Sequence, residues 1–412
     1  MSTTLAGLHA GDTLVVGQCA GEPTFLTAEV ARSRDRITGA TVYRGMSLSH
    51  TLTSRHADHL RFLSTGALGT NSELFKDGVL DLLPVPVSQI PVLWRTGRMP
   101  VDAVLVQASP AQPDGTCSLG VNADYLPAAI ETGAIVIAQI NDQMPVTKGD
   151  TRIRPERFAA SVVYSQELVE FPDALPSARD REVATHVAGL VHDGATIQVG
   201  VGGLGTAICE SLTNHRDLGI HTGLLTDSLV GLVRRGVVTN SRKPIDQGLV
   251  VTPVVMGSRE TYVWADHNAE LSVRRVEYTN GIRTLAQIAG FTAINFALEV
   301  DLYGQVNSEY AGDRYIGAIG GLPDFGRGAV EAEGGRSIIA MRAASSDGTR
   351  SRVVPRLGGP VVTAPRSDVD FVVTEHGVAD LRAASVADRA RRLIAIAAPQ
   401  FRSELEYLAR SM

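Results

Sequence analysis

The chain has 412 residues, of which 44% are hydrophobic and 20% are charged. This length exceeds what one ordinary domain needs, and the composition excludes a disordered, fibrous or disulfide-stabilised small protein. The formal net charge of −6 provides no overall field that would hold a polyphosphate backbone, so we expect no nucleic-acid partner.

The apolar runs in the sequence are too short to cross a membrane. The longest, residues 133–140 and 393–399, have less than half of the roughly 20 residues that a helical span requires. The N-terminus lacks the pattern of a secretory signal, and the three cysteines lie far apart and outside any metal or redox spacing. We therefore expect a cytoplasmic protein without membrane contact, whose thiols are buried and inert.

A predicted strand that runs into a glycine-rich turn occurs twice along the chain. Residues 11–17 (GDTLVVG) are followed by Gly21, and residues 194–200 (GATIQVG) are followed by Gly205. Segments 72–83 and 222–233 also resemble one another. This self-similarity predicts an internal duplication that produces two related α/β domains.

The segment 171–177 contains two prolines and precedes a helix predicted over residues 178–192. We therefore place the first domain at residues 1–176 and the second at 177–412. Short apolar runs alternate with amphipathic segments, which is typical of mostly parallel sheets covered by helices. These runs are residues 103–107, 134–140, 249–255, 337–341 and 369–373. Ligands in such folds bind beyond the carboxyl ends of the strands.

The first of two glycine clusters follows the second of these strand-turn motifs. The backbone N–H groups of Gly200, Gly202 and Gly203 can approach a phosphate or an acyl oxygen closely, because glycine has no side chain. The spacing matches neither the dinucleotide fingerprint nor the P-loop. Tight packing of a strand against a helix is the alternative explanation.

The second cluster places Gly317, Ala318, Ile319, Gly320 and Gly321 in one loop. The amides of its adjacent glycines could point at an oxyanion that develops during acyl transfer. An ordinary loop is an equally good explanation on local grounds.

No nucleophile or metal site is evident from the remaining motifs. The sequence has no G-x-S-x-G elbow and no S-x-x-K, and its histidines lack zinc-ligand spacing, so we expect no metal. Asp227, Glu299 and Glu375 could act as acids or bases, or could cap backbone amides.

Several longer segments resemble the acetyl-CoA hydrolase/transferase family, which includes 4-hydroxybutyrate and succinyl-CoA:acetate CoA-transferases. In the second half the resemblance rests on residues 217–222 (DLGIHT), 236–240 (GVVTN), 255–258 (VMGS), 297–306 (ALEVDLYGQV), 334–341 (GGRSIIAM) and 367–377 (SDVDFVVTEHG). In the first half it rests on residues 20–23 (AGEP), 117–121 (CSLGV) and 141–145 (NDQMP). The resemblance thus covers nearly the whole chain.

This resemblance implies two similar α/β domains and an acyl-CoA substrate, with coenzyme A as the carrier of the acyl group. In the family, a glutamate attacks the thioester and forms a glutamyl-CoA intermediate, and the loop similar to residues 317–325 stabilises the oxyanion. By analogy, the amides of Gly320 and Gly321 would take this role. The resemblance also implies a dimer or a larger homo-oligomer.

The chain departs from the family at the nucleophile. The family reads G-I-H-T-E-M-x-x-D-G, whereas residues 219–228 read GIHTGLLTDS, so Gly223 occupies the place of the glutamate. Glycine cannot form the covalent intermediate. We therefore expect direct attack on the thioester by an acceptor, which could be a metabolite amine, alcohol or carbanion, or water.

Other residues and other functions remain open. His221 would share a strand face with residue 223 and is a candidate base, and Glu73 stands at the position equivalent to Gly223 in the first repeat. Glu299 belongs to the family pattern in addition to the missing glutamate, which indicates a positioning role for Glu299. The alternatives are a CoA-transferase between short-chain acids that uses another nucleophile, and a CoA-binding protein without activity.

Overall fold

The computed structural model describes residues 5–410, which form two compact α/β units. The first unit contains the chain up to Pro172, together with residues 223–227 and 251–279. The second unit contains residues 173–222 and 228–250 and the chain from Asn280 onward. The chain therefore enters the second unit, returns twice to the first and ends in the second.

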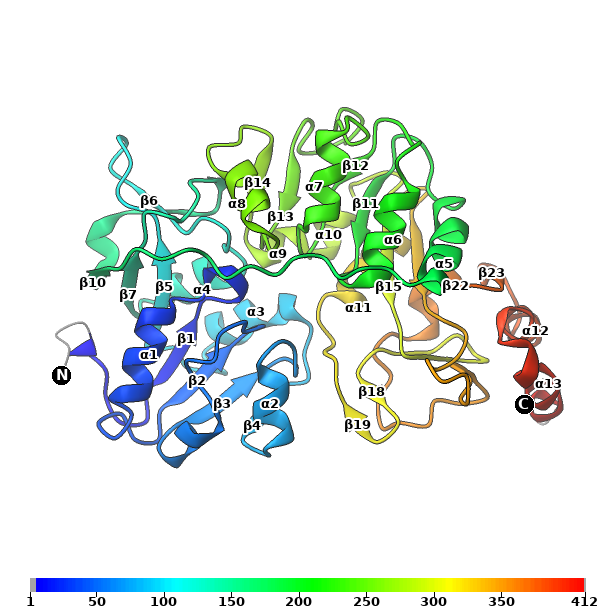
Figure 1. The fold of residues 1–412 in the computed structure, drawn as a ribbon, viewed down its shortest axis with the longest axis horizontal. Helices are drawn as coiled ribbons and strands as arrows, with labels where there is room; N and C mark the ends of the chain where they lie inside the picture. The colour runs from blue at the N-terminus through cyan, green and yellow to red at the C-terminus, as the bar shows by residue number, and fades with distance from the viewer. Residues whose placement is uncertain (1–4, 411–412) are drawn as a thin grey trace. The chain divides into compact units, whose positions relative to one another are not determined.

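The first unit is built on a seven-stranded sheet with the order β10-β7-β5-β1-β2-β3-β4, in which all neighbours are parallel (Figure 1). Its strands are β1 (Thr13–Val16), β2 (Thr41–Arg44), β3 (Arg61–Ser64), β4 (Leu80–Leu82), β5 (Ala103–Ala108), β7 (Ile135–Ile140) and β10 (Phe158–Val163). Every residue of the central strands β1 and β5 is buried, as expected for a parallel sheet covered on both faces.

Helices and short strands complete the first unit. They are η2 (Cys19–Gly21), α1 (Thr24–Arg32), η3 (Ser54–Asp58), α2 (Asn71–Lys76), η4 (Val87–Gln89), α3 (Ile90–Arg95), β6 (Cys117–Ser118), α4 (Leu126–Glu131), β8 (Lys148–Gly149), β9 (Arg152–Ile153), η5 (Pro155–Arg157), α8 (Arg259–Ala265), β14 (Leu271–Val273) and α9 (Val276–Thr279). Leu14 and Val16 belong to one apolar cluster and Val15 to another, so each face of the sheet has its own core.

The second unit has a six-stranded sheet with the order β12-β11-β15-β20-β22-β23. Its strands are β12 (Gly219–Ile220), β11 (Thr196–Val199), β15 (Thr292–Phe296), β20 (Arg336–Ala340), β22 (Phe371–Thr374) and β23 (Gly377–Asp380). All neighbours are parallel except β22 and β23, which form an antiparallel pair. The expected α/β class with two similar, mostly parallel domains is thus confirmed.

Further elements of the second unit are α5 (Ala178–Ala188), α6 (Gly203–Ser211), α7 (Asp227–Arg234), α10 (Ile282–Leu285), β16 (Glu299–Asp301), β17 (Val306–Asn307), β18 (Tyr310–Ala311), β19 (Arg314–Tyr315), α11 (Leu322–Glu331), β21 (Val353–Val354), η6 (Arg366–Asp368), α12 (Val386–Ile396), η7 (Pro399–Phe401) and α13 (Arg402–Ala409). The chain passes between the two units at α7 and again at β13 (Val250–Thr252).

The duplicated strands occupy equivalent places in the two sheets. β1 lies between β2 and β5, and β11 lies between β12 and β15. In each sheet the strand next in sequence lies on one side and a later strand lies on the other. The two matching strand-turn segments of the sequence are therefore inner strands of two similar sheets.

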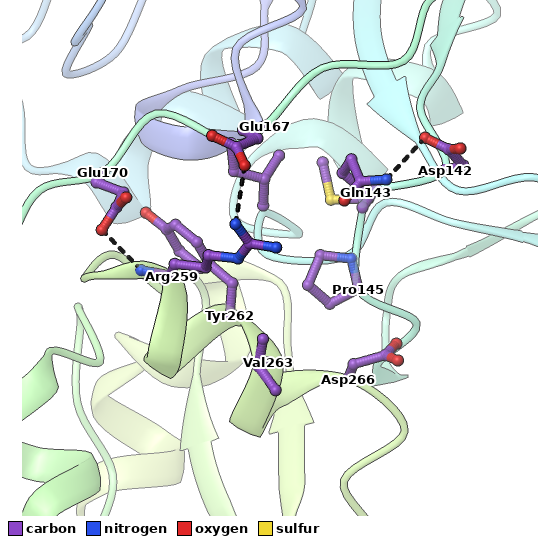
Figure 2. Close-up of a pocket in the computed structure, with 11 residues that line it drawn as sticks. Asp142, Gln143, Pro145, Glu167, Glu170, Arg259, Tyr262, Val263 and Asp266 are labelled. Carbon is purple, nitrogen blue, oxygen red and sulfur yellow. Dashed lines mark hydrogen bonds and ion pairs between the residues drawn. The ribbon is translucent and has the colours of Figure 1, made fainter.

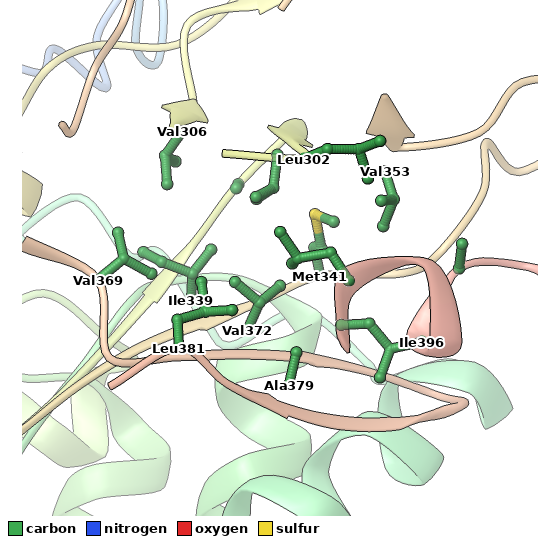
Figure 3. Packing of buried hydrophobic residues seen from close by; sticks show 14 of the residues in the cluster. Leu302, Val306, Ile339, Met341, Val353, Val369, Val372, Ala379, Leu381 and Ile396 are labelled. Carbon is green, nitrogen blue, oxygen red and sulfur yellow. The ribbon is translucent and has the colours of Figure 1, made fainter. Parts of the chain in front are cut away.

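The core of the second unit joins the large sheet to a small sheet with the order β17-β16-β21. Leu302, Val306 and Val353 lie on the side of the small sheet, opposite Ile339 and Val372 of the large sheet (Figure 3). All five are essentially excluded from water, and each such burial stabilises the fold by about 1.5–3 kcal/mol. The shared core therefore fixes the small sheet beside β20 and β22.

Two further expectations concern the membrane and the thiols. Among residues 5–410, no helix is long and apolar enough to cross a bilayer. Cys19, Cys117 and Cys209 are free and buried, as predicted. Burial raises the pKa of all three thiols, to about 12 for Cys209, so none is a ready thiolate at neutral pH.

Candidate functional site

The carboxyl ends of five parallel strands meet at one edge of the large sheet in the second unit, which we call the carboxyl edge. The residues that follow these strands are His221 after β12, Gly200 after β11, Ala297 after β15, Met341 after β20 and Glu375 after β22. Because ligands of open parallel sheets bind at such an edge, these segments form the candidate site.

The glycine turn after β11 brings helix α6 close to its strand. A Cβ on Gly200 would lie 2.9 Å from the Phe296 ring, and one on Gly205 would lie 2.2 Å from the carbonyl oxygen of Gly200. Gly202 has a φ of +121°, which favours glycine. Gly200 and Gly205 are therefore required for tight packing of the helix against the strand, which is the alternative explanation given for this cluster. Gly202 is required for the backbone conformation of the turn.

The same turn also leaves backbone donors open at the carboxyl edge. Gly202 is the N-cap of α6 and makes no side-chain cap. Among the described residues, none accepts a hydrogen bond from the amides of Gly202 and Gly203. These N–H groups at a helix N-terminus are suited to an anion or a polarised carbonyl oxygen.

The second glycine cluster lies at the N-terminus of α11. Two residues beyond the end of this helix, the carbonyl oxygen of Glu333 accepts a hydrogen bond from the amide of Gly290, just before β15 begins. Ten helical residues span about 15 Å and the five residues of β15 about 17 Å. The helix therefore runs back along the strand, so that its start, Gly320 and Gly321, lies toward the carboxyl edge.

Glycine is required at more than one place in this loop. A Cβ on Gly317 would lie 2.2 Å from the carbonyl oxygen of Ser308, whereas Gly320 has a φ of +58° with open space around it. Ala318 and Ile319 are half-buried. Within the described part of the chain, the amides of Gly320 and Gly321 donate to no protein acceptor, and α11 has no side-chain cap.

Two buried amide side chains lie near the carboxyl ends of β11 and β15. Gln198 of β11 donates through Nε2 to Oδ1 of Asn295 on β15, at 3.3 Å. Among residues 5–410, Gln198 Oε1 and Asn295 Nδ2 have no partner, although the two residues are only 4% and 7% exposed. Unsatisfied buried amides are costly, so a bound ligand that supplies a donor or an acceptor here would relieve that cost.

The face of the sheet on which these amides lie follows from strand register. Gln198 pairs with Ala293, and Asn295 stands two residues after Ala293, so all three side chains share a face. Ala293 packs with Phe325 of α11. Gln198 and Asn295 therefore lie on the α11 side of the sheet.

In the corresponding polar cluster of the first unit, the amide side chains have hydrogen-bond partners within the protein. Gln107 donates through Nε2 to the carbonyl oxygens of Ala20 and Glu22, and Asn141 donates through Nδ2 to Gln107 Oε1 at 2.7 Å. Gln139 accepts the amide of Phe25 at 3.0 Å. The duplicated sheets thus differ, because the second sheet leaves amide groups open at its carboxyl edge.

Charged residues at the carboxyl edge are held in fixed positions. Arg342 forms a two-pronged ion pair with Asp180 at 2.9 and 2.7 Å. Burial acts to raise the pKa of Asp180, but hydrogen bonds from Arg342 and Ser177 outweigh it and hold the pKa below 3.8. Glu375 accepts the amide of Ala343 at 2.8 Å, which is the capping role considered for it.

Asn307 anchors the segment that leads into the second glycine cluster. Its Nδ2 donates to the carbonyl oxygen of Tyr310 at 2.8 Å, and its Oδ1 accepts the amide of Glu309 at 3.0 Å. The same Nδ2 lies 3.4 Å from the Glu299 carboxylate, which agrees with a positioning role for that carboxylate. The sequence did not single out Asn307 or Arg342, since neither belongs to a recognisable motif by itself.

The four remaining predicted residues lie in different environments. His221 is fully buried and its ring stands edge-on to Phe291, with centroids 6.3 Å apart. Gly223 is the residue at which the chain passes from the second unit into the first. Glu73 is exposed on α2, 3.6 Å from His50. Asp227 accepts from the amide of Ser258 at 2.9 Å and from Thr261, and so caps the start of α8.

The first unit contains a separate cavity of about 230 Å³ (Figure 2). Arg259, Tyr262 and Val263 of α8 line one side, and the segment 142–145 lines another. Arg259 pairs with Glu167 at 2.9 Å, and its amide donates to Glu170. Among residues 5–410, no group of three or more His, Cys, Asp or Glu side chains is arranged to hold a metal ion.

Family models match both ends of the chain, and known proteins match almost its whole length. Residues 3–172 match the acetyl-CoA hydrolase/transferase N-terminal domain, and residues 257–409 match the C-terminal domain of the same family. The chain is 33% identical over 395 residues to a 4-hydroxybutyrate coenzyme A transferase of Clostridium kluyveri, covering 95% of this chain and 92% of the relative. It is 36% identical over 356 residues to a succinyl-CoA:acetate/propanoyl-CoA:succinate CoA transferase of Fasciola hepatica, covering 85% and 74%.

Solved structures agree with these relatives. RipA from Yersinia pestis superposes with a TM-score of 0.93 at 34% identity, covering 99% of this chain and 96% of RipA. A 4-hydroxybutyrate CoA-transferase from Porphyromonas gingivalis gives 0.83 at 30% identity, covering 99% and 95%. The resemblance read from the sequence is confirmed: the chain belongs to the acetyl-CoA hydrolase/transferase family, whose members transfer or hydrolyse acyl-CoA thioesters.

Proposed function

We propose that this protein transfers the acyl group of an acyl-CoA directly to an acceptor, without a glutamyl-CoA intermediate. The acceptor is a metabolite with an amine, hydroxyl or carbanion nucleophile, or water. Its nucleophilic atom attacks the thioester carbonyl, the carbonyl oxygen becomes an oxyanion, and the carbon–sulfur bond then breaks. CoA leaves as a thiolate and takes up the proton that the acceptor loses.

The observation that carries this proposal is Gly223 in the segment GIHTGLLTD. The family pattern has glutamate at this place, and glycine offers no side-chain atom for a covalent intermediate. A missing carboxylate also removes a negative charge and side-chain volume, which leaves room for an acceptor.

The open donors of the carboxyl edge support retained chemistry. Donors that are fixed before the reaction stabilise an oxyanion by about 3–4 kcal/mol without a covalent step. We assign this role to the amides of Gly320 and Gly321. We assign binding of the CoA thioester to the turn of Gly200, Gly202 and Gly203 and to the loop of Gly317, Ala318 and Ile319. We keep His221 as the candidate base.

Release of free thiol from acyl-CoA tests the proposal. The purified protein is incubated with acetyl-, butyryl- or succinyl-CoA, with and without amine, alcohol and carboxylate acceptors, and free CoA is measured with a thiol reagent. We expect release that depends on an acceptor or on water. No release with any acceptor would rule out the enzymatic function and leave binding of CoA alone, which calorimetry would detect.

A second candidate is a CoA-transferase in which another carboxylate replaces the glutamate. Glu299 and Glu375 favour it, because both follow strands at the carboxyl edge. Incubation with acyl-CoA and then hydroxylamine or borohydride, followed by peptide mass mapping, distinguishes the two. A modified peptide that contains residue 299 or 375 supports the transferase, and an unmodified protein that turns over supports direct attack.

We also propose that the protein works in the cytoplasm, which its free, buried cysteines support, and that it forms a homo-oligomer, as expected from the family resemblance. Light scattering coupled to size-exclusion chromatography tests the assembly. A mass equal to the single chain of 43.7 kDa would contradict it.

A further inference from the structure

A small cavity of about 70 Å³ opens beside the carboxyl edge of the second unit. Three segments line it: Leu298 and Glu299 just after β15, the hairpin residues 310–312, and Ser345 with residues 350–352. The cavity thus adjoins the candidate site but contains none of the glycines assigned above.

The two arginines in this lining are Arg350 and Arg352, and hydrogen bonds at both the N–H and the C=O group fix the backbone of each. Arg352 donates its amide to the carbonyl oxygen of Ala343 and accepts the amide of Val300, both at 2.9 Å. The amide of Arg350 donates to Ser345 Oγ at 3.0 Å, and its carbonyl oxygen accepts the amide of Ser345 at 2.9 Å. The small sheet, which is anchored in the core (Figure 3), therefore holds Arg352 next to its strand β21. The turn at Ser345 holds Arg350, and both residues line the same cavity.

The guanidinium groups of these arginines are uncommitted. In the part of the chain that the structure describes, the side chains of Arg350 and Arg352 form no ion pair and no hydrogen bond. Burial, together with the charges of Arg342 and Arg350, lowers the pKa of Arg352, while Glu375 and Glu299 act against this. The lining holds two arginines and one carboxylate, Glu299, while a second carboxylate, Glu375, acts on Arg352 from nearby. The two guanidinium groups keep unused donors in this cavity.

We propose that Arg350 and Arg352 bind an anionic oxygen group of the substrate, either a phosphate of the CoA moiety or a free carboxylate on the acyl chain. This inference rests on the proposed function for its substrate class. The planar guanidinium matches both groups, because each presents two oxygens to its paired donors. A cavity of about 70 Å³ accepts one such group and is too small for a nucleotide.

Binding of unreactive thioethers separates the two sources of the anion. The probes are S-butyl-CoA and S-(3-carboxypropyl)-CoA, and the same two thioethers of pantetheine, which lacks every phosphate. Dissociation constants are measured for the wild type and for the double variant Arg350→Gln/Arg352→Gln. Arg350→Glu is a second variant at an exposed position that should not disturb folding. Arg356→Gln, exposed and outside the cavity, is the matched control.

We expect the double variant to bind more weakly by a factor of roughly ten or more, as loss of charge-assisted hydrogen bonds implies. If the anion is a phosphate, both CoA thioethers weaken and neither pantetheine thioether does. If it is the acyl carboxylate, both carboxypropyl compounds weaken and neither butyl compound does. The inference is overturned if both arginine variants bind all four probes as the control does, or if the wild type binds none.

These measurements are independent of turnover. A wild type that binds the probes through Arg350 and Arg352 but releases no CoA from any thioester would refute the proposed function and leave the anion site standing. A wild type that releases CoA with unchanged binding in the variants would refute only the anion site.

Discussion

The side chain missing at residue 223 sets the chemistry open to this protein. If Gly223 occupies the place of the family nucleophile, Gly223→Glu should restore a carboxylate that can attack the thioester. We expect the variant to gain exchange of CoA between carboxylic acids and to carry a glutamyl adduct that hydroxylamine traps at residue 223. Exchange of labelled acetate into acetyl-CoA, with peptide mapping, measures both.

Gly231→Glu is the matched control for that experiment, because residue 231 lies on α7 with open space around its Cα. It should leave acetate exchange at the wild-type level. Equal behaviour of the two variants would show that residue 223 does not face the thioester.

Asp124 in the first unit is a buried carboxyl group that should make stability depend on pH. Burial raises its pKa from 3.8 to about 7, although Gln18 donates a hydrogen bond to it. The folded protein therefore retains a proton that the unfolded chain releases above about pH 4, so the contribution of Asp124 to stability is lost progressively as pH rises toward and through 7.

We expect Asp124→Asn to remove this loss, because asparagine stays neutral and tolerates the φ of +43° at this position. Between pH 5 and 8 the wild type should lose on the order of 1–3 kcal/mol relative to the variant. Urea unfolding at several pH values measures it, with the exposed Asp81→Asn as control. Parallel pH profiles for wild type and Asp124→Asn would contradict the assignment.

At the scale of single elements, the edge strand β12 depends on two side chains for its outer hydrogen bonds. Ile220 donates its amide to Asn240 Oδ1 at 2.8 Å, and its carbonyl oxygen accepts from Lys243 Nζ at 3.0 Å. Lys243 also donates to the carbonyl oxygen of Leu249 at 2.7 Å, and burial lowers its pKa to about 8. These contacts hold the end of β12, which leads directly to His221.

Removal of either side chain should loosen this edge. Lys243→Met leaves the buried carbonyl of Ile220 and the partly buried carbonyl of Leu249 without this donor, at a cost of about 1–3 kcal/mol. Asn240→Ala leaves the amide of Ile220 without its acceptor. We expect faster hydrogen exchange at residues 220–222 in both variants, measured by mass spectrometry. Arg242→Ala, an exposed neighbour, should not change that exchange. Protection equal to that of the wild type in both variants would refute the role of this pair.

At the scale of the whole molecule, local sequence predicted the sheets but not the pairings that complete the units. The repeats at residues 11–17 and 194–200 predicted β1 and β11 because strand and glycine turn are short-range signals. Arg352 could not be predicted as a neighbour of Glu299, since the ladder of β16 and β21 joins residues some fifty positions apart. The open amides of Gln198 and Asn295 likewise arise only when two strands pair.

No sequence pattern predicted that residues 251–279 return to the first unit, and this return affects how that unit folds. Within that unit the amide of Ala123 donates to the carbonyl oxygen of Pro253, and the amide of Val276 donates to that of Asp124, at 3.1 and 2.9 Å. Val276 is buried in one of the two cores. A fragment that ends at Pro172 would expose these groups.

We therefore expect residues 1–172 alone to lack a cooperative unfolding transition, even though they contain all seven strands of the sheet. A matched fragment, in which a flexible linker joins residue 172 to residues 251–279, should unfold cooperatively, because Phe171 already donates its amide to the carbonyl oxygen of Gly257 at 2.9 Å. Calorimetry on both fragments measures this. A sharp transition in residues 1–172 alone would show that the first unit folds without residues 251–279. A cooperative transition only in the linked fragment would show that residues 251–279 are needed to complete the first unit.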